Sequence, residues 1–261
     1  MPPFQIAIKI RNLRLPLKRA LQVAHQLGAT AVEIDGREEI RPADLSDSGR
    51  RQLRKLLDDL NLRVAAVSFP TRRGYNVAES LDERVAATKN VMRMAYELGS
   101  SIVVNQVGRV PADAEAPDWP ILLEALTDLG AFGQRVGATL TAETGSESGE
   151  DLARLIAALP DGSLGVTFNP GNLIINGFIP LDAVAVLGRS ILYVHAKDGV
   201  RDQARGRGDE VALGRGVADF PAILGALEDF NYRGALCVAR DQAEDPAFEI
   251  GQAIKFLQSL S

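Results

Sequence analysis

Polar side chains follow short apolar runs at four points in the second half of the chain. Glu143 ends LTAE, Asn169 follows VTF, His195 follows YV, and Arg240 with Asp241 follows LCVA. A carboxylate, an amide and an imidazole that meet in one place can move protons, hold a divalent cation or hydrogen-bond a polyhydroxylated ligand. The ends of strands also meet solvent, so one such residue alone supports either interpretation. Four together favour a site.

His195 is one of only two histidines. At the end of an apolar strand, a structural histidine would need a partner for each ring nitrogen, so we interpret His195 as catalytic or as a ligand. His25 lies within a helical segment and is interpreted as structural or exposed. Lys197 and Asp198 follow His195 directly. Asp198 could orient His195 or a substrate hydroxyl, and a salt bridge to Lys197 or a nearby arginine is the alternative.

The elements that must position these residues are short apolar strands that alternate with longer helical segments. The eight predicted strands are Gln5 to Lys9, Ala31 to Ile34, Arg63 to Ser68, Ser101 to Asn105, Thr139 to Glu143, Leu164 to Phe168, Ile191 to His195 and Ala235 to Ala239. Glycines expected to end helices precede four strands, at Gly28, Gly99, Gly137 and Gly234. Eight such units, without a G-x-G-x-x-G after the first strand, predict a closed (β/α)8 TIM barrel rather than an open sheet.

In such a barrel the loops after the strands form the functional face. The longest irregular stretch, 199–216, carries arginines among its glycines, at Arg201, Arg205, Arg207 and Arg215. It could close over an anionic or polyhydroxylated ligand, or remain a solvated loop. Polar residues near earlier strand ends could complete a pocket or merely cap turns; they are Glu33, Ser68, Asn105 and Gln106.

Composition limits the remaining possibilities. We expect residues 1–261 to form a single domain, because barrels of this kind need roughly 250 residues. The net charge of -5 and the scattered basic residues argue against a nucleic-acid partner. Cys237 is the only cysteine, which excludes an internal disulfide. No signal segment or apolar run of membrane length is present, so we expect a soluble cytoplasmic protein with no membrane partner.

Several fragments resemble a known family from about Ala20 to the end of the chain. They are TAETG, FNPGNL, YVHAKDGV, LGRGVADFPAIL and YRGALCVARD, and their order and spacing are those of the xylose-isomerase-like sugar phosphate isomerases and epimerases. The resemblance implies a TIM barrel with a small sugar-like ligand. It also implies that Asn172 lies in a turn that faces the ligand, and it leaves a homo-oligomer open, since barrels of this family are often dimers or tetramers.

In that family, Glu, Asp, His and Glu hold a divalent manganese, magnesium or zinc ion, and the two glutamates exchange protons with the sugar. The resemblance places these positions on Glu143, Asn169, His195 and Ala239. An amide brings no charge to the ion, and an alanine cannot bind it. Asp241 has the strand parity of Ala239 but lies about 6.5–7 Å further along. We therefore expect a site of Glu143, Asn169 and His195 to bind the ion weakly or not at all.

Two functions remain open, and a third is disfavoured. One is an isomerase or epimerase of a small sugar, sugar phosphate or polyol, with Glu143 and His195 as the catalytic residues. The other is a catalytically inactive barrel of the same family that binds a sugar-like ligand or has a regulatory role. In both, the expected ligand-binding residues are Asn169, Asn172, Lys197, Asp198, Arg240 and Asp241. A histidine-rich three-metal nuclease similar to endonuclease IV is disfavoured, because the chain is acidic and has two histidines.

Overall fold

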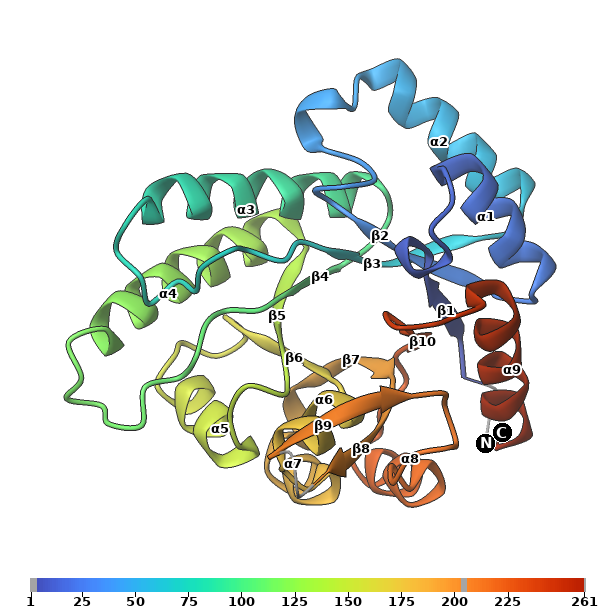
Figure 1. The fold of residues 1–261 in the computed structure, drawn as a ribbon. Helices are drawn as coiled ribbons and strands as arrows, with labels where there is room; N and C mark the ends of the chain where they lie inside the picture. The colour runs from blue at the N-terminus through green and yellow to red at the C-terminus, as the bar shows by residue number, and fades with distance from the viewer. Residues whose placement is uncertain (1–3, 203–205, 261) are drawn as a thin grey trace.

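The computed structural model describes residues 4–202 and 206–260. Its centre is a closed barrel of parallel strands in the order β1-β10-β7-β6-β5-β4-β3-β2 (Figure 1). The barrel strands are β1 (Ile6–Lys9), β2 (Ala31–Asp35), β3 (Arg63–Ser68), β4 (Ile102–Asn105), β5 (Thr139–Glu143), β6 (Gly165–Phe168), β7 (Ile191–Ala196) and β10 (Leu236–Val238). Each lies within one or two residues of a predicted strand, which confirms the (β/α)8 prediction.

Helices lie around the outside of the barrel (Figure 1). They are α1 (Leu17–Gln26), α2 (Asp47–Asp59), α3 (Leu81–Glu97), α4 (Trp119–Val136), α5 (Gly149–Ala157), α6 (Pro170–Asn176), α7 (Pro180–Leu187), α8 (Phe220–Asp229) and α9 (Pro246–Ser259). Short 3-10 turns are η1 (Ile10–Leu13), η2 (Pro42–Asp44) and η3 (Gly188–Ser190). None of the helices in the described part of the chain has the length and apolar character needed to cross a membrane.

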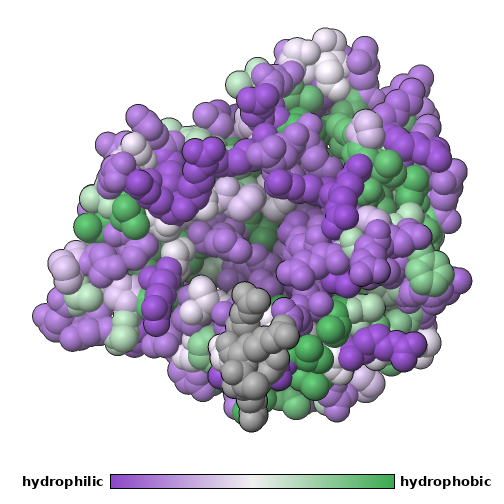
Figure 2. Space-filling model, viewed as in Figure 1, coloured by the Kyte–Doolittle hydropathy of each residue, from purple (hydrophilic) through white to green (hydrophobic). Residues whose placement is uncertain are grey.

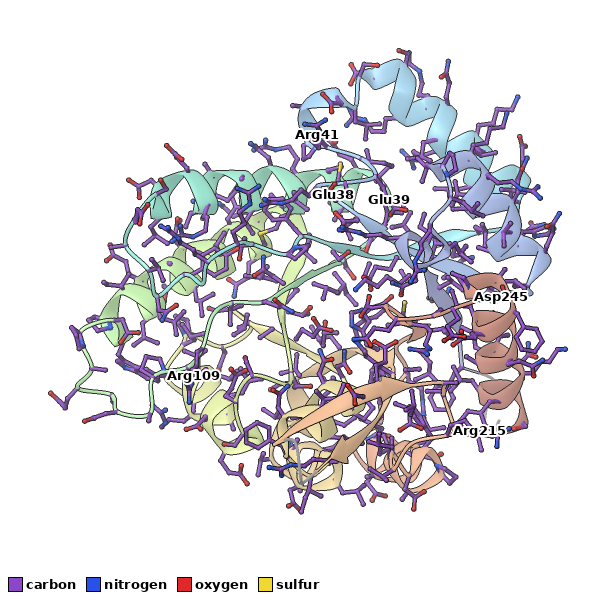
Figure 3. All side chains as sticks on the ribbon, in the orientation of Figure 1. Glu38, Glu39, Arg41, Arg109, Arg215 and Asp245 are labelled. Atoms are coloured by element: carbon purple, nitrogen blue, oxygen red, sulfur yellow. The ribbon has the colours of Figure 1, made fainter. Side chains whose placement is uncertain are left out.

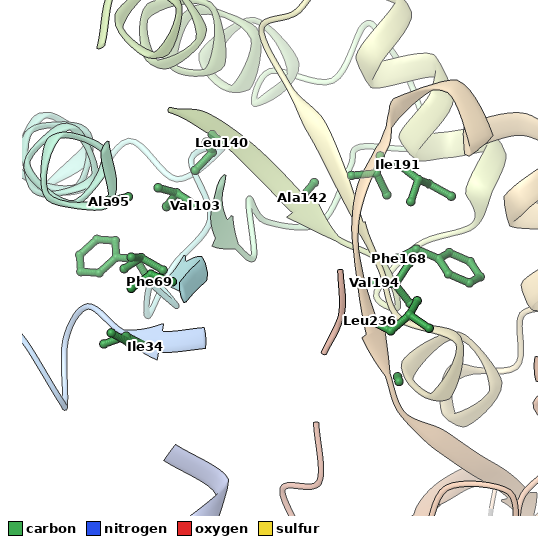
Figure 4. Packing of buried hydrophobic residues seen from close by; sticks show 14 of the residues in the cluster. Ile34, Phe69, Ala95, Val103, Leu140, Ala142, Phe168, Ile191, Val194 and Leu236 are labelled. Carbon is green, nitrogen blue, oxygen red and sulfur yellow. The ribbon is translucent and has the colours of Figure 1, made fainter. Parts of the chain in front are cut away.

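The main hydrophobic core fills the layer between strands and helices. Ile34, Val103, Leu140 and Val194 on the strands are buried together with Ala95 on α3 (Figure 4). Aliphatic side chains dominate this layer because both faces of a parallel sheet are covered. The burial of these side chains, which favours folding by about 25 cal/mol for each Å² of apolar surface, holds the strands in fixed register.

A second, smaller cluster lies where alternate residues point into the barrel. Most of its members have small side chains that pack around Tyr193; they are Ala7, Ala31, Ala66, Val104, Ala235 and Cys237. Two residues further along β1, β2 and β7, strand alternation places Lys9, Glu33 and His195 on the same interior side. The apolar floor of the barrel therefore supports a polar layer at the carboxyl ends of the strands.

Two details differ from the predictions. The stretch 199–216, predicted to be irregular, contains most of an antiparallel hairpin of β8 (Asp198–Asp202) and β9 (Arg207–Val211). Gly28, Gly99 and Gly137 adopt the left-handed conformation expected after helices, but Gly234 does not. Asn231 takes that conformation after α8, while a Cβ at Gly234 would lie 2.7 Å from the Leu192 carbonyl oxygen. Close backbone approach, rather than helix termination, accounts for this glycine.

Candidate active site

A cavity of about 330 Å³ opens at the carboxyl ends of the strands. The face of the molecule in Figure 2 is hollowed near its centre, and hydrophilic residues surround the hollow. The lining includes Glu143, His195 and Asp241 from the predicted set. It also includes residues of earlier strand ends and of η1, among them Lys9, Arg11, Asn12, Arg14, Asp35, Ser68, Asn105 and Gln106. The volume is at the lower end of the range for small-molecule sites.

His195 lies between two carboxylates. Its Nδ1 is 2.7 Å from Glu143 Oε1, and its Nε2 is 2.6 Å from Glu33 Oε2. Burial opposes the charged ring, but the carboxylates of Glu33 and Glu143 outweigh burial and raise the pKa of His195 to about 9. At neutral pH the ring is therefore an imidazolium, and both of its N–H groups donate to carboxylates.

Glu143 ends β5 with its two oxygens in different environments. Its Oε1 accepts from His195 and from Asn169 Nδ2 at 2.8 Å, whereas Oε2 has Gln106 Nε2 at 3.5 Å. Burial favours the neutral acid, but the His195 imidazolium and Lys9 outweigh burial and lower the pKa of Glu143 to about 2. Glu143 is thus a fixed carboxylate, and its Oε2 is the oxygen with room for a ligand.

Asn169 connects β6 to α6 and uses both ends of its amide. Its Oδ1 accepts from the backbone N–H of Asn172 at 2.9 Å and so caps α6, while its Nδ2 donates to Glu143. The helix cap requires the oxygen at this position, which fixes the orientation of the amide. Asn169 therefore positions Glu143, and the amide oxygen is directed away from that carboxylate.

Lys9 and Asp241 form the opposite side of the cavity from β1 and from the segment after β10. The Nζ of Lys9 is 3.6 Å from Asp241 Oδ1. Burial alone would lower the pKa of Lys9, but the carboxylates of Glu33, Asp241 and Glu143 outweigh it and raise the pKa above its usual value. Burial would raise the pKa of Asp241, but Lys9 and Lys197 hold it well below its usual range.

Lys197 and Arg240 belong to an ion-pair network beside the cavity. Lys197 Nζ contacts Asp241 Oδ2 at 2.7 Å and Glu210 Oε2 at 2.9 Å. Arg240 contacts Glu210 at 2.7 Å and Glu249 at 2.8 Å. Neither basic residue is part of the cavity lining. Both form ion pairs with Glu210 of β9, so the network links the hairpin to the segments that follow β7 and β10. Substrate binding by Lys197 and Arg240 stays a prediction.

Asp198 is surrounded by backbone N–H groups. Its carboxylate accepts from Gly199, Gly214, Gly216 and Ala218 at 2.8–3.1 Å. The segment LGRGVAD is therefore a turn folded around a buried carboxylate, and Asp198 pairs with neither His195 nor Lys197. Its alternative role of contacting a substrate hydroxyl is untested.

Asn172 lines a neighbouring cleft of about 390 Å³ that shares Gln106 and Glu143 with the first cavity. Arg109, in the loop after β4, contributes to this cleft, whereas Arg215 lies at the edge of the face in Figure 3. Arg201 and Arg215 line neither cavity. Arg205 and the side chain of Arg207 lie outside the described residues. The described arginines of stretch 199–216 thus border neither of these two cavities.

Two polar atoms in the cavity wall have no partner among the described residues of the protein. They are Ser68 Oγ and Asn105 Oδ1, both buried. The amide nitrogen of Asn105 donates to the Phe69 carbonyl oxygen at 2.6 Å and to the Tyr75 hydroxyl at 3.2 Å, which fixes its oxygen in place. Buried polar atoms are rarely left unpaired, so these two favour a polar ligand or water at the wall.

The side chains at the positions implied for a divalent metal do not fit such an ion. Both nitrogens of His195 are bonded to carboxylates, the Asn169 oxygen caps a helix, and Ala239 is buried with a methyl side chain. The Lys9 ammonium also brings a positive charge to the same place. A hard dication prefers several free anionic oxygens, and here the carboxylates already have cationic partners.

A different set of potential ligands lies deeper, at Glu33, His195 and Cys237, whose ligand atoms are within 4.8 Å of one another. A cysteine binds a metal as its thiolate and not as its thiol. Burial, reinforced by the charge of Glu33, raises the pKa of the Cys237 thiol well above its usual value. Binding here would require deprotonation of both the thiol and the His195 Nε2, which donates to Glu33.

Sequence reasoning gave no role to Lys9 and only a general one to Glu33. A lysine at the end of IAIK is ordinarily solvent-exposed, and nothing local distinguishes this one. The signal that could have found them is the alternation of side chains along a strand. Lys9 and Glu33 each lie two residues after an alanine that points into the barrel, so they point inward too, and they are partners in the β1–β2 register.

Comparison with known proteins supports the same architecture. The chain is 24% identical over 233 residues to an inosose dehydratase of Clostridium beijerinckii, covering 75% of this chain and 74% of that protein. The structure of a xylose isomerase domain protein from Planctomyces limnophilus superposes with a TM-score of 0.87 at 25% identity, covering 99% and 98% of the two chains. A barrel from Mycobacterium smegmatis, crystallised in complex with magnesium, has a TM-score of 0.78 at 16% identity, covering 99% and 96%.

The model of one protein family, described as xylose isomerase-like TIM barrel, matches residues 21–260. This match begins within α1 and runs from β2 to α9, so it includes the strand ends that carry Glu143 and His195 but not β1 with Lys9. The chain belongs to the xylose isomerase-like TIM barrel family.

Proposed function

We propose that this protein moves a proton at the carbon next to the carbonyl group of a small polyhydroxylated ketone, such as a keto-sugar or keto-polyol. The observation that carries the proposal is the Glu143 carboxylate, which is anchored through Oε1 and leaves Oε2 beside the cavity. An anchored carboxylate that faces a bound ketone can take the proton from the carbon next to the carbonyl. The relatives named as inosose dehydratases act on a substrate of this class.

In the proposed proton transfer, Glu143 is the base and the carbonyl oxygen of the ketone receives the electron pair. The C–H bond breaks, its proton goes to Glu143 Oε2, and the electron pair moves to the carbonyl oxygen to form an enolate. The imidazolium of His195 holds Glu143 in position but also makes it a weak base, since the pKa of the carboxylate is about 2. Strong stabilisation of the enolate must therefore accompany the transfer.

The reaction that follows depends on where the proton returns. Epimerisation needs a second acid on the opposite face of the carbon. Ala239, directly after β10, offers only a methyl group there, and Asp241 is paired with Lys9 and Lys197. Transfer on one face, by isomerisation or by elimination of a neighbouring hydroxyl group, fits these residues better than epimerisation does.

The test follows removal of the proton from carbon, a step that all these reactions share, through its exchange with solvent while Glu143 carries it. Keto-sugars and an inosose are incubated with the protein in D₂O, and exchange of the hydrogen next to the carbonyl is followed by NMR. We expect exchange in the wild type and a loss of about 100-fold or more in Glu143→Gln. Glu147→Gln is the matched control, because Glu147 lies in the loop directly after β5 but lines neither cavity. Equal rates in the wild type and Glu143→Gln would contradict the assigned role.

A catalytically inactive barrel that binds such a ligand is the second candidate. The observation that favours it is the ion-paired state of every carboxylate at the base of the cavity, which leaves Glu143 a weak base. A barrel of this kind would be stabilised against heat by a ketone that shows no exchange in D₂O. Thermal shift and exchange measured on one set of compounds separate the two functions.

A further inference from the structure

The base of the cavity contains a balanced set of fixed charges. The carboxylates of Glu33 and Glu143 flank the His195 imidazolium, and Asp241 lies between Lys9 and Lys197. Within this set Lys9 is the cation that faces the cavity, since its side chain is 19% exposed and lines the wall, whereas the His195 side chain is 1% exposed. A ligand that enters therefore meets one ammonium group beside the Glu143 carboxylate.

The strands explain how a long side chain fits here. Lys9 pairs with Glu33 on one neighbouring strand, and on the other side the register runs from Ala7 beside Cys237 to Ile8 beside Val238. Continued by one residue, that register places Lys9 beside Ala239. The small methyl group of Ala239 leaves room for the lysine stem, where a larger acidic side chain would compete with it.

The N–H donors of the Lys9 ammonium group are available for a ligand. Its ion-pair contact within the described residues, Asp241 Oδ1 at 3.6 Å, is longer than the roughly 2.7–3.2 Å of an N–H···O hydrogen bond. An ammonium group has three N–H donors, so donors remain for a ligand oxygen. The surrounding carboxylates keep this group in its charged form, which excludes a neutral amine that could attack a carbonyl carbon.

We propose that the Lys9 ammonium group donates to the carbonyl oxygen of the bound ketone and takes the place of a divalent metal ion in this site. As Glu143 Oε2 takes the proton, the electron pair that moves to the oxygen is stabilised by a fixed positive charge. The proton later returns from Glu143 to carbon and the enolate reverts to the ketone, so no metal or redox partner is needed. The catalytic part of this inference rests on the proposed function; the claim about the cation does not.

The first experiment measures binding of Mn²⁺ by calorimetry, without any substrate. We expect no stoichiometric binding to the wild type, and a new site in the variant Lys9→Met/Asn169→Asp/Ala239→Glu, which removes the ammonium group and adds two carboxylates. Stoichiometric Mn²⁺ binding to the wild type that is lost in His195→Ala would overturn the proposal. If that binding is lost in Cys237→Ala as well, the deeper group of Glu33, His195 and Cys237 holds the ion, which also contradicts it.

The second experiment compares an inosose with inositol, its reduced counterpart, as ligands. The wild type should bind the ketone at least tenfold more tightly. Lys9→Met should lose this preference, Lys9→Arg should retain part of it, and Lys18→Met, which removes an exposed lysine of α1, should keep it. Circular dichroism verifies that each variant is folded. An unchanged preference in folded Lys9→Met would refute the role of Lys9.

Exchange in D₂O provides the third measurement and distinguishes the two proposals. With Lys9 as the donor, EDTA leaves the wild-type rate unchanged, and Lys9→Met reduces it by about 100-fold or more. Loss of the rate in EDTA with recovery in Mn²⁺, or a stable adduct at Lys9 after borohydride reduction, would contradict the inference while leaving Glu143 as the base. No exchange with any ketone would defeat the proposed function, and the calorimetry would still decide which cation occupies the site.

Discussion

Replacement of Glu33 by glutamine tests whether His195 is held as an imidazolium between two carboxylates. Glutamine keeps the shape of the side chain but removes the charge opposite Nε2. The pKa of His195 is raised from 6.5 to about 9, which corresponds to about 3 kcal/mol of stabilisation of the charged ring. Because two carboxylates share this effect, we expect Glu33→Gln to lower the free energy of unfolding by about 1–3 kcal/mol near pH 6.

The pH dependence has a definite sign. A pKa raised by folding stabilises the native state fully below the unfolded value of 6.5, and the stabilisation is lost as the pH rises through about 9. The difference in stability between the wild type and Glu33→Gln should therefore be largest near pH 6, shrink as the pH rises from 6.5 to about 9, and be nearly lost above that pH. Glu38→Gln, which neutralises an exposed carboxylate in the loop after β2 (Figure 3), is the matched control and should show no such trend.

NMR titration of the two imidazole rings gives the direct measurement, and urea unfolding at each pH gives the free energies. His25, exposed on α1, provides the second resonance in each spectrum. We expect His195 to titrate near pH 9 in the wild type and at a lower pH in Glu33→Gln. If His195 titrates near 6.5 in the wild type, or if the variant leaves its titration unchanged, the ring is not held as described.

Three further variants test the framework around the site by urea unfolding. Asp198→Ala should lower the free energy of unfolding by about 3 kcal/mol, because four backbone N–H groups lose their acceptor. A decrease below about 0.5 kcal/mol would contradict this expectation. Gly216→Ala should lower the free energy of unfolding by about 1–3 kcal/mol, since the added Cβ would lie 2.1 Å from Asp198 Oδ1. Gly225→Ala is the control: its Cβ would have no atom within 4 Å, so this variant should be as stable as the wild type or more stable. Thr141→Val should lower the free energy of unfolding by about 1–2 kcal/mol, because the Thr167 hydroxyl loses its hydrogen bond to the Thr141 hydroxyl, 2.6 Å away. The double variant with Thr167→Val should lose less stability than the sum of the two single variants.

The barrel was predictable because each strand has a local signature. The run IVVN of β4 is apolar until its last residue, and β5 is a β-branched and aliphatic run that ends on Glu143. Glycines after α1, α3 and α4 have the left-handed backbone that ends a helix. The hairpin after β7 was missed because Asp198–Asp202 and Arg207–Val211 lack alternating apolar residues. Their pairing, together with contacts to α6, defines them as strands.

Within the site, the sequence indicated which strand ends matter but not how their side chains pair. Glu143 and His195 were predicted together, and they are in contact. The roles of Lys9 and Glu33 depend on the register of β1 with β2 and β10, which is a tertiary property. The N–H groups that Asp198 binds are up to 20 residues further along the chain, so no local pattern points to them.

A structure of the protein with an inosose in the cavity would test the central claim most directly. We predict the carbonyl oxygen within about 3.2 Å of Lys9 Nζ, the neighbouring C–H directed at Glu143 Oε2, and His195 still bonded to both carboxylates. A divalent ion that joins the ligand oxygens to Glu143 and a rotated His195, with Lys9 turned away, would contradict the account.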